Sequence, residues 1–303
     1  MTTQRFSVLR SVLLAGGISA LLLSGQPSAS AAAADPAPLQ AHARSTALRI
    51  GTFNLDADVP LDTWRTAVGQ FLPYTDIAGM QEVAGKAKKE VLEGLPGIGS
   101  YVPRHTQDPI LWNDSLYSLV GGRSAPMAAG RRVEAPTGRG TIWQPTKKAT
   151  VARLRNRATG QVLSVIDVHM LHQAVDKGKP VKGVPRRVRM YKDQVKGLDR
   201  IIATERSWSG GRVWVLGDFN DNYMADKELH RRALAYSHLH RHHLVASWET
   251  RGRIKPGRGT STGNGSYLDA IYALQPAASV RVLRQSRFDI GQHYPLLSSY
   301  NVP

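Results

Sequence analysis

The chain of 303 residues contains no cysteine. This absence excludes disulfide bonds, thiol nucleophiles and cysteine-ligated zinc. A protein of this length can bury enough apolar surface to fold without disulfides, so the absence is compatible with an extracellular location. Internal repeats and long low-complexity linkers are also lacking, which favours a single large α/β domain.

Long apolar runs are scarce as well. The main one, residues 12–23, follows Arg5 and Arg10 and precedes the small-residue segment 27–34. A charged start, a short apolar core and a small-residue end are typical of a secretory signal peptide, and the run is short for a membrane span. We expect a secreted, extracellular protein with no transmembrane segment in its mature chain; the alternative is an uncleaved N-terminal anchor. The expected divisions are a signal peptide (1–34), a Pro/Ala-rich tether (35–47) and a folded domain (48–303).

Acidic residues are few relative to basic ones. Forty Lys and Arg residues face 23 Asp and Glu residues, which gives a net charge of +17. Such an excess favours polyanionic partners, namely nucleic acid, acidic lipid head groups or cell-wall polymers. The basic residues cluster in segments 131–157, 177–200 and 251–255. The alternative is a solvated basic surface without a specific partner.

Apolar runs of strand length alternate with amphipathic stretches. Residues 48–53 are expected to form a strand that ends at Asn54, and residues 62–72 a helix with Trp64, Val68 and Phe71 on one side. The other expected elements are strands at 77–80, 162–166, 267–274 and 295–302, a strand from 213 to Asp218, a hairpin formed by 110–112 and 116–120, and a helix over 188–204. This order predicts mixed β-sheets covered by helices.

Polar side chains follow several of these strands. The run 213–220 reads VWVLGDFN, so a carboxylate and an amide, Asp218 and Asn220, come directly after a buried strand. Residues two apart on extended backbone point the same way, which would place the two side chains side by side. Residues at or near strand ends recur along the chain: Asn54, Glu82, His169, Asp218, Asn220, Asp269 and His293. Their shared position predicts one crevice at an edge of the sheets.

The residue types in this set suit one kind of chemistry. Carboxylates and amides hold a hard divalent cation and a water molecule, and imidazoles transfer protons or stabilise an oxyanion. A phosphodiester is itself an anion, so its hydrolysis needs a cation and an imidazolium to spread the developing charge.

Six segments resemble, in order, the motifs of the endonuclease/exonuclease/phosphatase superfamily, which includes pancreatic-type deoxyribonuclease. They are RIGTFNL (49–55), MQEV (80–83), DVHM (167–170), LGDFND (216–221), YLDAI (267–271) and QHYPL (292–296). The resemblance covers residues 48–303, which it identifies as a catalytic domain. It implies a four-layer α/β sandwich, with two mixed sheets packed face to face and helices outside, and divalent-metal-dependent hydrolysis of phosphate esters.

The resemblance also implies roles for the polar residues. Glu82 resembles the metal-binding carboxylate, with Asn54 beside it, and the metal would be Mg²⁺ or Mn²⁺. Asp218 resembles the group that orients or deprotonates the attacking water, and Asn220 the group that positions this water and the phosphate. Asn54 and His169 are expected to help position the phosphate.

The two histidines have distinct implied roles. His293 resembles the histidine that is paired with a carboxylate, here Asp269, whose negative charge would fix the imidazole tautomer and raise its pKa. His169 resembles a second imidazole that faces the phosphate oxygens or the leaving group.

One position departs from the family pattern. Ser-Asp-His usually precedes the final aromatic-proline pair, and this Asp often helps to bind the metal, whereas here Gly291 and Gln292 precede His293. Gln292 offers a carbonyl oxygen without charge, so we expect weaker metal binding or a shifted ion. Loss of catalysis, leaving a protein that only binds polyanions, is one alternative.

These features predict a secreted metal-dependent phosphodiesterase, in the first place a nuclease that cleaves DNA or RNA, and a monomer. The alternative enzyme is a phospholipid phosphodiesterase or phosphatase similar to a sphingomyelinase. That enzyme would need an exposed apolar hairpin to enter a membrane, for which Ile142 and Trp143 are the nearest candidates.

Two further features are ambiguous. The run HLHRHH at 238–243 is expected to be a solvated helix end or loop rather than a metal site, because the usual carboxylate partner is not visible in the sequence. Trp143 and Tyr223 are candidates for stacking on a base or sugar, the alternative being positions in the core.

Overall fold

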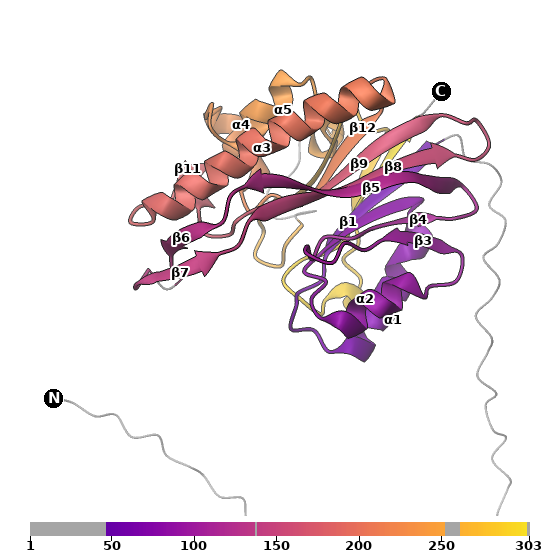
Figure 1. Ribbon diagram of the computed structural model, residues 1–303, viewed down its shortest axis with the longest axis horizontal. Coiled ribbons are helices and arrows are strands. Elements are labelled where there is room, and N and C mark those ends of the chain that lie inside the picture. The colour runs from indigo at the N-terminus through magenta and orange to yellow at the C-terminus, as the bar shows by residue number, and fades with distance from the viewer. Residues whose placement is uncertain (1–46, 137, 252–260, 302–303) are drawn as a thin grey trace, which may run out of the picture. The chain divides into compact units, whose positions relative to one another are not determined.

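Two mixed six-stranded β-sheets form the centre of the fold (Figure 1). The structure is a computed structural model, and it describes residues 47–136, 138–251 and 261–301. The expected signal peptide, most of the expected tether and most of the basic segment 251–255 lie outside the described residues. The described residues all belong to one unit, His42–Pro303.

The first sheet combines the two ends of the folded unit. Its strand order is β15 (Ser279–Val282), β16 (Leu296–Asn301), β1 (Ala47–Asn54), β2 (Ile77–Gln81), β4 (Ile110–Asn113) and β3 (Ile98–Tyr101). Only β1 and β2 run parallel; the other neighbours are antiparallel.

The second sheet is built from the middle of the chain. Its strand order is β13 (Val245–Ala246), β14 (Asp269–Ala273), β12 (Val213–Asp218), β9 (Val162–His169), β8 (Lys147–Asn156) and β5 (Tyr117–Ala128). Here β9 and β12 are the parallel pair. Both sheets are therefore mixed, as the sequence predicts.

Helices cover the outer faces of both sheets. Figure 1 shows α1 (Leu61–Phe71) and α2 (Lys86–Glu93) beside the first sheet, and α3 (Pro185–Ser209), α4 (Tyr223–Leu229) and α5 (Ala235–Arg241) beside the second. The buried residues of α1 include Trp64, Val68 and Phe71, as its helical spacing predicts. The described residues also form three short 3₁₀ helices: η1 (Leu72–Tyr74), η2 (Ser247–Arg251) and η3 (Ser286–Phe288). The predicted four-layer α/β sandwich is confirmed.

Two small hairpins lie outside the main sheets. They are β6 (Arg131–Glu134) with β7 (Thr141–Gln144), and β10 (Val175–Asp176) with β11 (Lys179–Pro180). In Figure 1 the β6–β7 hairpin extends beside the N-terminal half of α3. None of the helices in the described part of the chain is long and apolar enough to cross a membrane.

The sheets approach each other closely at Gly79 of β2. A Cβ atom at this position would lie 2.0 Å from Cδ1 of Leu216 in β12 and 2.8 Å from Cγ of Asp167 in β9. Because glycine leaves this space free, the two sheets meet directly behind the strand ends that precede Glu82 and His169.

The predicted hairpin of residues 110–112 and 116–120 is wrong. The strands β4 and β5 occupy these positions, but β4 pairs with β2 and β3 in the first sheet, whereas β5 pairs with β8 in the second. The turn at Asn113 and Asp114 therefore carries the chain from one sheet to the other. Elsewhere the expected elements are present with shifted ends; α3, for example, is longer than the predicted helix 188–204.

Candidate active site

The strand ends bring the predicted polar residues to one edge of the two sheets. In the first sheet Asn54 is the last residue of β1 and pairs with Gln81, which immediately precedes Glu82. In the second sheet Asp218, the last residue of β12, pairs with His169 on one side and Asp269 on the other. Parallel neighbours end at the same edge, and the antiparallel β14 begins there.

Asn54 connects the two sheets. Its Nδ2 donates hydrogen bonds to Oε1 of Glu82 (3.2 Å) and to Oδ2 of Asp218 (3.0 Å). The other atom of the amide, Oδ1, is buried and has no protein partner. Glu82 has a φ of 61°, a left-handed conformation that is uncommon for a residue with a side chain, and its Oε2 accepts a hydrogen bond from the backbone N–H of Ala57 (2.9 Å). These contacts fix the Glu82 carboxylate next to the Asn54 amide, whose Oδ1 has no protein partner.

His169 lies between the two carboxylates. Its Nε2 is 3.6 Å from Oδ2 of Asp218 and 3.8 Å from Oε1 of Glu82. Burial lowers the pKa of His169 to about 4, against the opposing effect of the Asp218 charge, and the positive charge of Lys147 adds to the lowering. The ring is therefore neutral near pH 7 and can donate one hydrogen bond without carrying charge.

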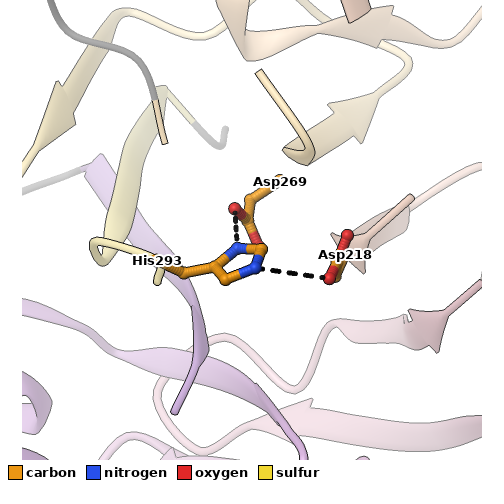
Figure 2. A group of neighbouring side chains, drawn as sticks. All are labelled: Asp218, Asp269 and His293. Atoms are coloured by element: carbon orange, nitrogen blue, oxygen red, sulfur yellow. Dashed lines mark hydrogen bonds and ion pairs between the residues drawn. The ribbon is translucent and has the colours of Figure 1, made fainter. Parts of the chain in front are cut away.

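His293 is held between two buried aspartates (Figure 2). Its Nδ1 is hydrogen-bonded to Oδ2 of Asp269 (2.7 Å), and its Nε2 lies 3.8 Å from Oδ2 of Asp218. Burial alone would lower the pKa of His293, but the charges of Asp269 and Asp218 outweigh it and raise the pKa to about 10. The ring is therefore an imidazolium at neutral pH, and its charge favours the ionised form of Asp218, whose pKa burial raises.

Asn220 lies next to Asp218, as expected, but its backbone conformation is not the extended one that the sequence predicts. The strand ends at Asp218 and Asn220 has a φ of 48°, so the backbone forms a turn here and is not extended. Within this turn, the Asn220 backbone N–H donates to Oδ1 of Asp218 (2.7 Å), and its Nδ2 donates to Oδ2 (3.2 Å) and to the carbonyl of Met170 (3.1 Å). The two side chains are adjacent, but the inference from extended backbone was wrong.

Two groups of residues offer atoms that could hold a cation. The first is the Glu82 carboxylate with the unpartnered Oδ1 of Asn54; both are hard oxygen donors of the kind that Mg²⁺ and Mn²⁺ prefer. In the described part of the chain, the one cluster of three acidic or histidine residues consists of Asp218, Asp269 and His293. In this cluster Nδ1 of His293 is hydrogen-bonded to Asp269 (2.7 Å), so one of its two ring nitrogens is already engaged. The chemistry of the donors therefore fits a cation at Glu82 and Asn54.

Gln292 does not take part in this arrangement. Gln292 is exposed, and its backbone carbonyl accepts a hydrogen bond from the N–H of Gly263 (3.0 Å). Asp289, the nearest carboxylate before it in sequence, accepts a hydrogen bond from the hydroxyl of Tyr294 (3.1 Å).

Sequence reasoning missed a polar network beneath the site. Gln81 donates from Nε2 to Oδ1 of the buried Asp167 (2.6 Å) and accepts from the hydroxyl of Thr52 (3.1 Å). This network joins β1, β2 and β9 across the two sheets. Gln81 and Asp167 stand inside the MQEV and DVHM motifs, so their positions next to Glu82 and near His169 were the available signal.

Asp108 and Lys147 were also missed. Burial raises the pKa of Asp108 to about 7, opposed by the charge of Lys147, and burial lowers the pKa of Lys147. Both residues lie close enough to influence the site electrostatically, since Lys147 also lowers the pKa of His169. Neither belongs to a motif, and an aspartate before a proline reads as an ordinary turn.

The histidine-rich run at 238–243 is partly different from expectation. It includes the end of α5, as predicted, but His238 is buried rather than solvated. His238 Nδ1 is hydrogen-bonded to Asp199 of α3, and Nε2 of His242 lies 3.2 Å from the same carboxylate. Asp199 also lies 3.6 Å from the Arg241 guanidinium, so these contacts fasten α5 to α3.

The two candidate stacking residues differ in environment. Tyr223 is buried and makes edge contacts with Tyr236 and Tyr272, so it belongs to the core. Trp143 has 62% of its surface exposed on β7. Of the glycine-rich segment 257–265, residues 257–260 lie outside the described residues.

No protein-family model and no curated protein matches this chain. Several solved structures are similar in fold. The endonuclease/exonuclease/phosphatase from Bacteroides vulgatus aligns with a TM-score of 0.60 at 20% identity, covering 84% of this chain and 98% of that one. TDP2 of D. rerio, complexed with a single-strand DNA product, aligns with a TM-score of 0.56 at 13% identity over 85% of this chain and 100% of that one. A mannosyl-6-phosphatase from Bacteroides thetaiotaomicron aligns with a TM-score of 0.55 at 15% identity, covering 83% of this chain and 98% of that one.

These similarities define the class of fold. The chain has the endonuclease/exonuclease/phosphatase fold, and at this level the resemblance seen in the sequence motifs is confirmed.

Proposed function

We propose that this chain is a secreted, divalent-metal-dependent phosphoric ester hydrolase that cleaves nucleic acid. The observation that carries the proposal is the environment of Asp218, a buried carboxylate that contacts Asn54 on one side and an imidazolium, His293, on the other. Proteins of this fold include TDP2, complexed with a DNA product, and a mannosyl-6-phosphatase. Both names support hydrolysis of a phosphate ester. Because they differ in substrate, the substrate of this chain has to be argued from its own surface.

Glu82 and Asn54 would hold the cation, Mg²⁺ or Mn²⁺. When bound, the cation supplies charge neutralisation at the phosphate oxygens. A site with one carboxylate suits Mg²⁺, which keeps several of its own waters and needs few protein ligands. The exposed Gln292 is not required as a ligand.

Asp218 and Asn220 would handle the attacking water. Asp218 accepts the proton of the water, and the pKa that burial raises makes this carboxylate a stronger base than an exposed one. The Asn220 amide, fixed by its bonds to Asp218 and the Met170 carbonyl, positions the water and the phosphate.

The two histidines would act on the phosphate in different charge states. His293 is an imidazolium whose orientation is set by Asp269, and it stabilises negative charge that develops on a phosphate oxygen. His169 is neutral and donates a hydrogen bond to a phosphate or leaving-group oxygen. The different environments of the two rings separate the two roles.

Nucleic acid is favoured as the substrate by the net charge of +17. The test compares hydrolysis of nucleic acid, sphingomyelin and a sugar phosphate by the wild type and by Asp218→Asn, with Mg²⁺ or Mn²⁺ and with a chelator. We expect nucleic acid to be cleaved, the activity to vanish with the chelator, and Asp218→Asn to lower kcat about 10²- to 10⁴-fold.

Other outcomes would favour the alternatives. Cleavage of sphingomyelin without cleavage of nucleic acid would replace the nuclease with a phospholipid phosphodiesterase. Binding of nucleic acid without hydrolysis of any ester would mean that the fold has kept only polyanion binding.

A further inference from the structure

A cavity of about 870 Å³ opens beside His169. One wall is formed by α2 and the loop after β3, which ends at Asp108, and the other by residues 145–148, where β8 begins. The cavity therefore continues from the candidate active site along the surface of the domain. Apart from His169, its lining residues have no role in the chemistry assigned above.

The cavity is lined by more basic than acidic side chains. The basic residues apart from histidine are Lys86, Lys89, Arg104, Lys147 and Lys148, and the acidic ones are Glu90, Glu93 and Asp108. Glu90 is paired with Lys86 (3.3 Å), and the pKa of about 7 leaves Asp108 partly protonated at neutral pH. The inner end of the cavity, next to His169, is lined by Lys147, whose positive charge acts on His169. A wall of this composition suits a chain of phosphates.

One wall of the cavity is held rigidly by a lysine. Nζ of Lys89 donates hydrogen bonds to the backbone carbonyls of Pro103 (2.9 Å), Arg104 (3.3 Å) and Thr106 (2.8 Å). This ammonium group ties α2 to the loop and leaves its charge fixed at the cavity. The cavity is thus formed before any ligand enters, which reduces the entropic cost of binding.

The chain leads from the other wall directly into the β6–β7 hairpin. Pro145 and Thr146 line the cavity, and Trp143 stands two residues before Pro145. Trp143 is the most exposed of the six tryptophans, and its ring packs over Gly130, where a Cβ atom would come within 3.0 Å of it. Its cross-strand neighbour is the exposed Arg132. An exposed aromatic ring beside a guanidinium and a basic cavity offers a face on which a base can stack and charge that attracts the phosphates.

The hairpin that carries Trp143 is anchored to the body of the domain. The Glu134 carboxylate at the end of β6 accepts hydrogen bonds from the backbone N–H groups of Arg186 (3.3 Å) and Arg187 (2.9 Å) in the first turn of α3. The buried Arg187 guanidinium donates back to the Glu134 carbonyl (2.6 and 3.0 Å). The ring is therefore presented by a fixed element.

We propose that the cavity and Trp143 together form a subsite for single-stranded nucleic acid, in which the positive charge of the cavity attracts phosphates and Trp143 stacks on an unpaired base. The proposal rests on the proposed function, because the same strand would extend from the subsite into the active site, with the phosphate to be cleaved near Asp218. A base must be unpaired to present its face to a protein ring, and every base has such a face, so single strands of any sequence bind better than duplex. A bilayer fits this surface less well, because Ile142, with 36% of its surface exposed, is the one other exposed large apolar residue on β7.

The test follows tryptophan fluorescence of the full mature chain during titration with a ten-residue oligothymidylate, in the presence of a chelator so that no hydrolysis occurs. Stacking on a base quenches an exposed tryptophan, and we expect quenching that is lost in Trp143→Phe. We expect Trp143→Ala to weaken binding of the labelled oligonucleotide about tenfold, and Trp143→Phe, which keeps an aromatic ring, to restore most of it. The matched control is Trp208→Phe, because Trp208 lies under the Arg153 guanidinium (4.5 Å) on α3 and its loss should change neither signal.

Three results would overturn the subsite. The first is an unchanged affinity of Trp143→Ala for the oligonucleotide, and the second is an equal affinity of the wild type for duplex and single strand. The third is a blue shift of the Trp143 fluorescence with acidic-lipid vesicles and no response to the oligonucleotide. This third result would assign the hairpin to a membrane surface. The outcome is separable from the proposed function. If the protein hydrolyses bis(p-nitrophenyl) phosphate but Trp143→Ala binds the oligonucleotide as the wild type does, only the subsite proposal is contradicted. If binding depends on Trp143 but no ester is hydrolysed, only the proposed hydrolase function is contradicted.

Discussion

His293 keeps its positive charge because two carboxylates, both almost fully buried, face its ring. Desolvation alone would neutralise a histidine in this position, as it does His169 on the other side of Asp218. Asp269 makes the difference, since it bonds to Nδ1 of His293 at 2.7 Å and has no counterpart beside His169 at that distance. Two histidines that contact the same aspartate thus hold different charge at neutral pH.

This difference predicts the effect of Asp269→Asn. The amide keeps the shape of the side chain but removes a negative charge, so the pKa of His293 falls from about 10 toward or below its ordinary value of 6.5. The active imidazolium form then persists only at lower pH, and the alkaline limb of the pH profile of kcat/KM moves to lower pH. We expect activity at pH 8 to fall about 10²-fold. A profile of phosphodiester hydrolysis from pH 5 to pH 10 checks this, and an alkaline limb in the same place in both proteins would contradict the role of Asp269.

At the scale of elements, the site depends on how closely β2 approaches β12. Gly79 lies where the two sheets meet, and the next residues along β2 lead to Glu82. The hydrogen bonds from Gln81 to Asp167 and from Asn54 to Asp218 cross the same interface. The packing of the sheets therefore sets the distance between Glu82, the proposed metal ligand, and Asp218, the proposed catalytic carboxylate.

Gly79→Ala should be strongly destabilising. The added methyl group would overlap the ends of Leu216 and Asp167, and overpacking of this kind costs roughly 1–3 kcal/mol of unfolding free energy. The matched control is Gly69→Ala on the exposed face of α1, where no atom lies within 4 Å of the new Cβ and helix propensity should add up to about 1 kcal/mol of stability. Urea unfolding of both variants measures the difference, and equal stabilities would show that the sheets do not meet at Gly79.

The strands were predictable from sequence where a local pattern decides the structure. The all-buried β12 and the spacing of Trp64, Val68 and Phe71 are examples. The hairpin prediction failed because the turn after β4 has the same local chemistry whether the chain returns to its own sheet or enters the other one. Only the pairing of β5 with β8, more than twenty residues on, decides between the two.

The same limit applies to the site. Its strand-end residues could be predicted because each stands in a recognisable motif, whereas Asp108, Lys147 and Trp143 belong to none. Their importance arises from neighbours in space, such as the cavity that Asp108 and Lys147 share. Exposure is also invisible in sequence, and it separates Trp143 from the buried Tyr223.

At the scale of the whole molecule, the excess of basic residues should make nucleic-acid binding sensitive to salt. The net charge of +17, of which Arg5 and Arg10 in the expected signal peptide contribute two, favours contacts with phosphates that release counterions. Raising NaCl from 50 to 200 mM should weaken binding of a labelled oligonucleotide about 10²-fold or more, whereas hydrolysis of bis(p-nitrophenyl) phosphate, which has a single charge, should change far less. Fluorescence polarisation at several salt concentrations gives the slope, and a flat slope would remove the electrostatic argument for a nucleic-acid substrate.

The N-terminal segment predicts export. A short apolar run after Arg5 and Arg10, followed by small residues, is typical of a secretory signal peptide, and we expect cleavage between Ala31 and Asp35. When the full chain is expressed in a bacterial host, N-terminal sequencing of the protein in the medium should begin within that window. An intact N-terminus in the membrane fraction would instead support the anchor alternative.

The most direct test of the account is plasmid nicking by the mature chain with Mg²⁺ or Mn²⁺, with a chelator, and with Glu82→Ala. The control is Glu228→Ala, which removes an exposed carboxylate on α4. We expect nicking that requires the metal, persists in Glu228→Ala and falls at least about 10²-fold in Glu82→Ala, since the carboxylate beside the free carbonyl of Asn54 is lost. Nicking that continues in the chelator, or that is unchanged in Glu82→Ala, would contradict a metal-dependent nuclease centred on Glu82 and Asp218.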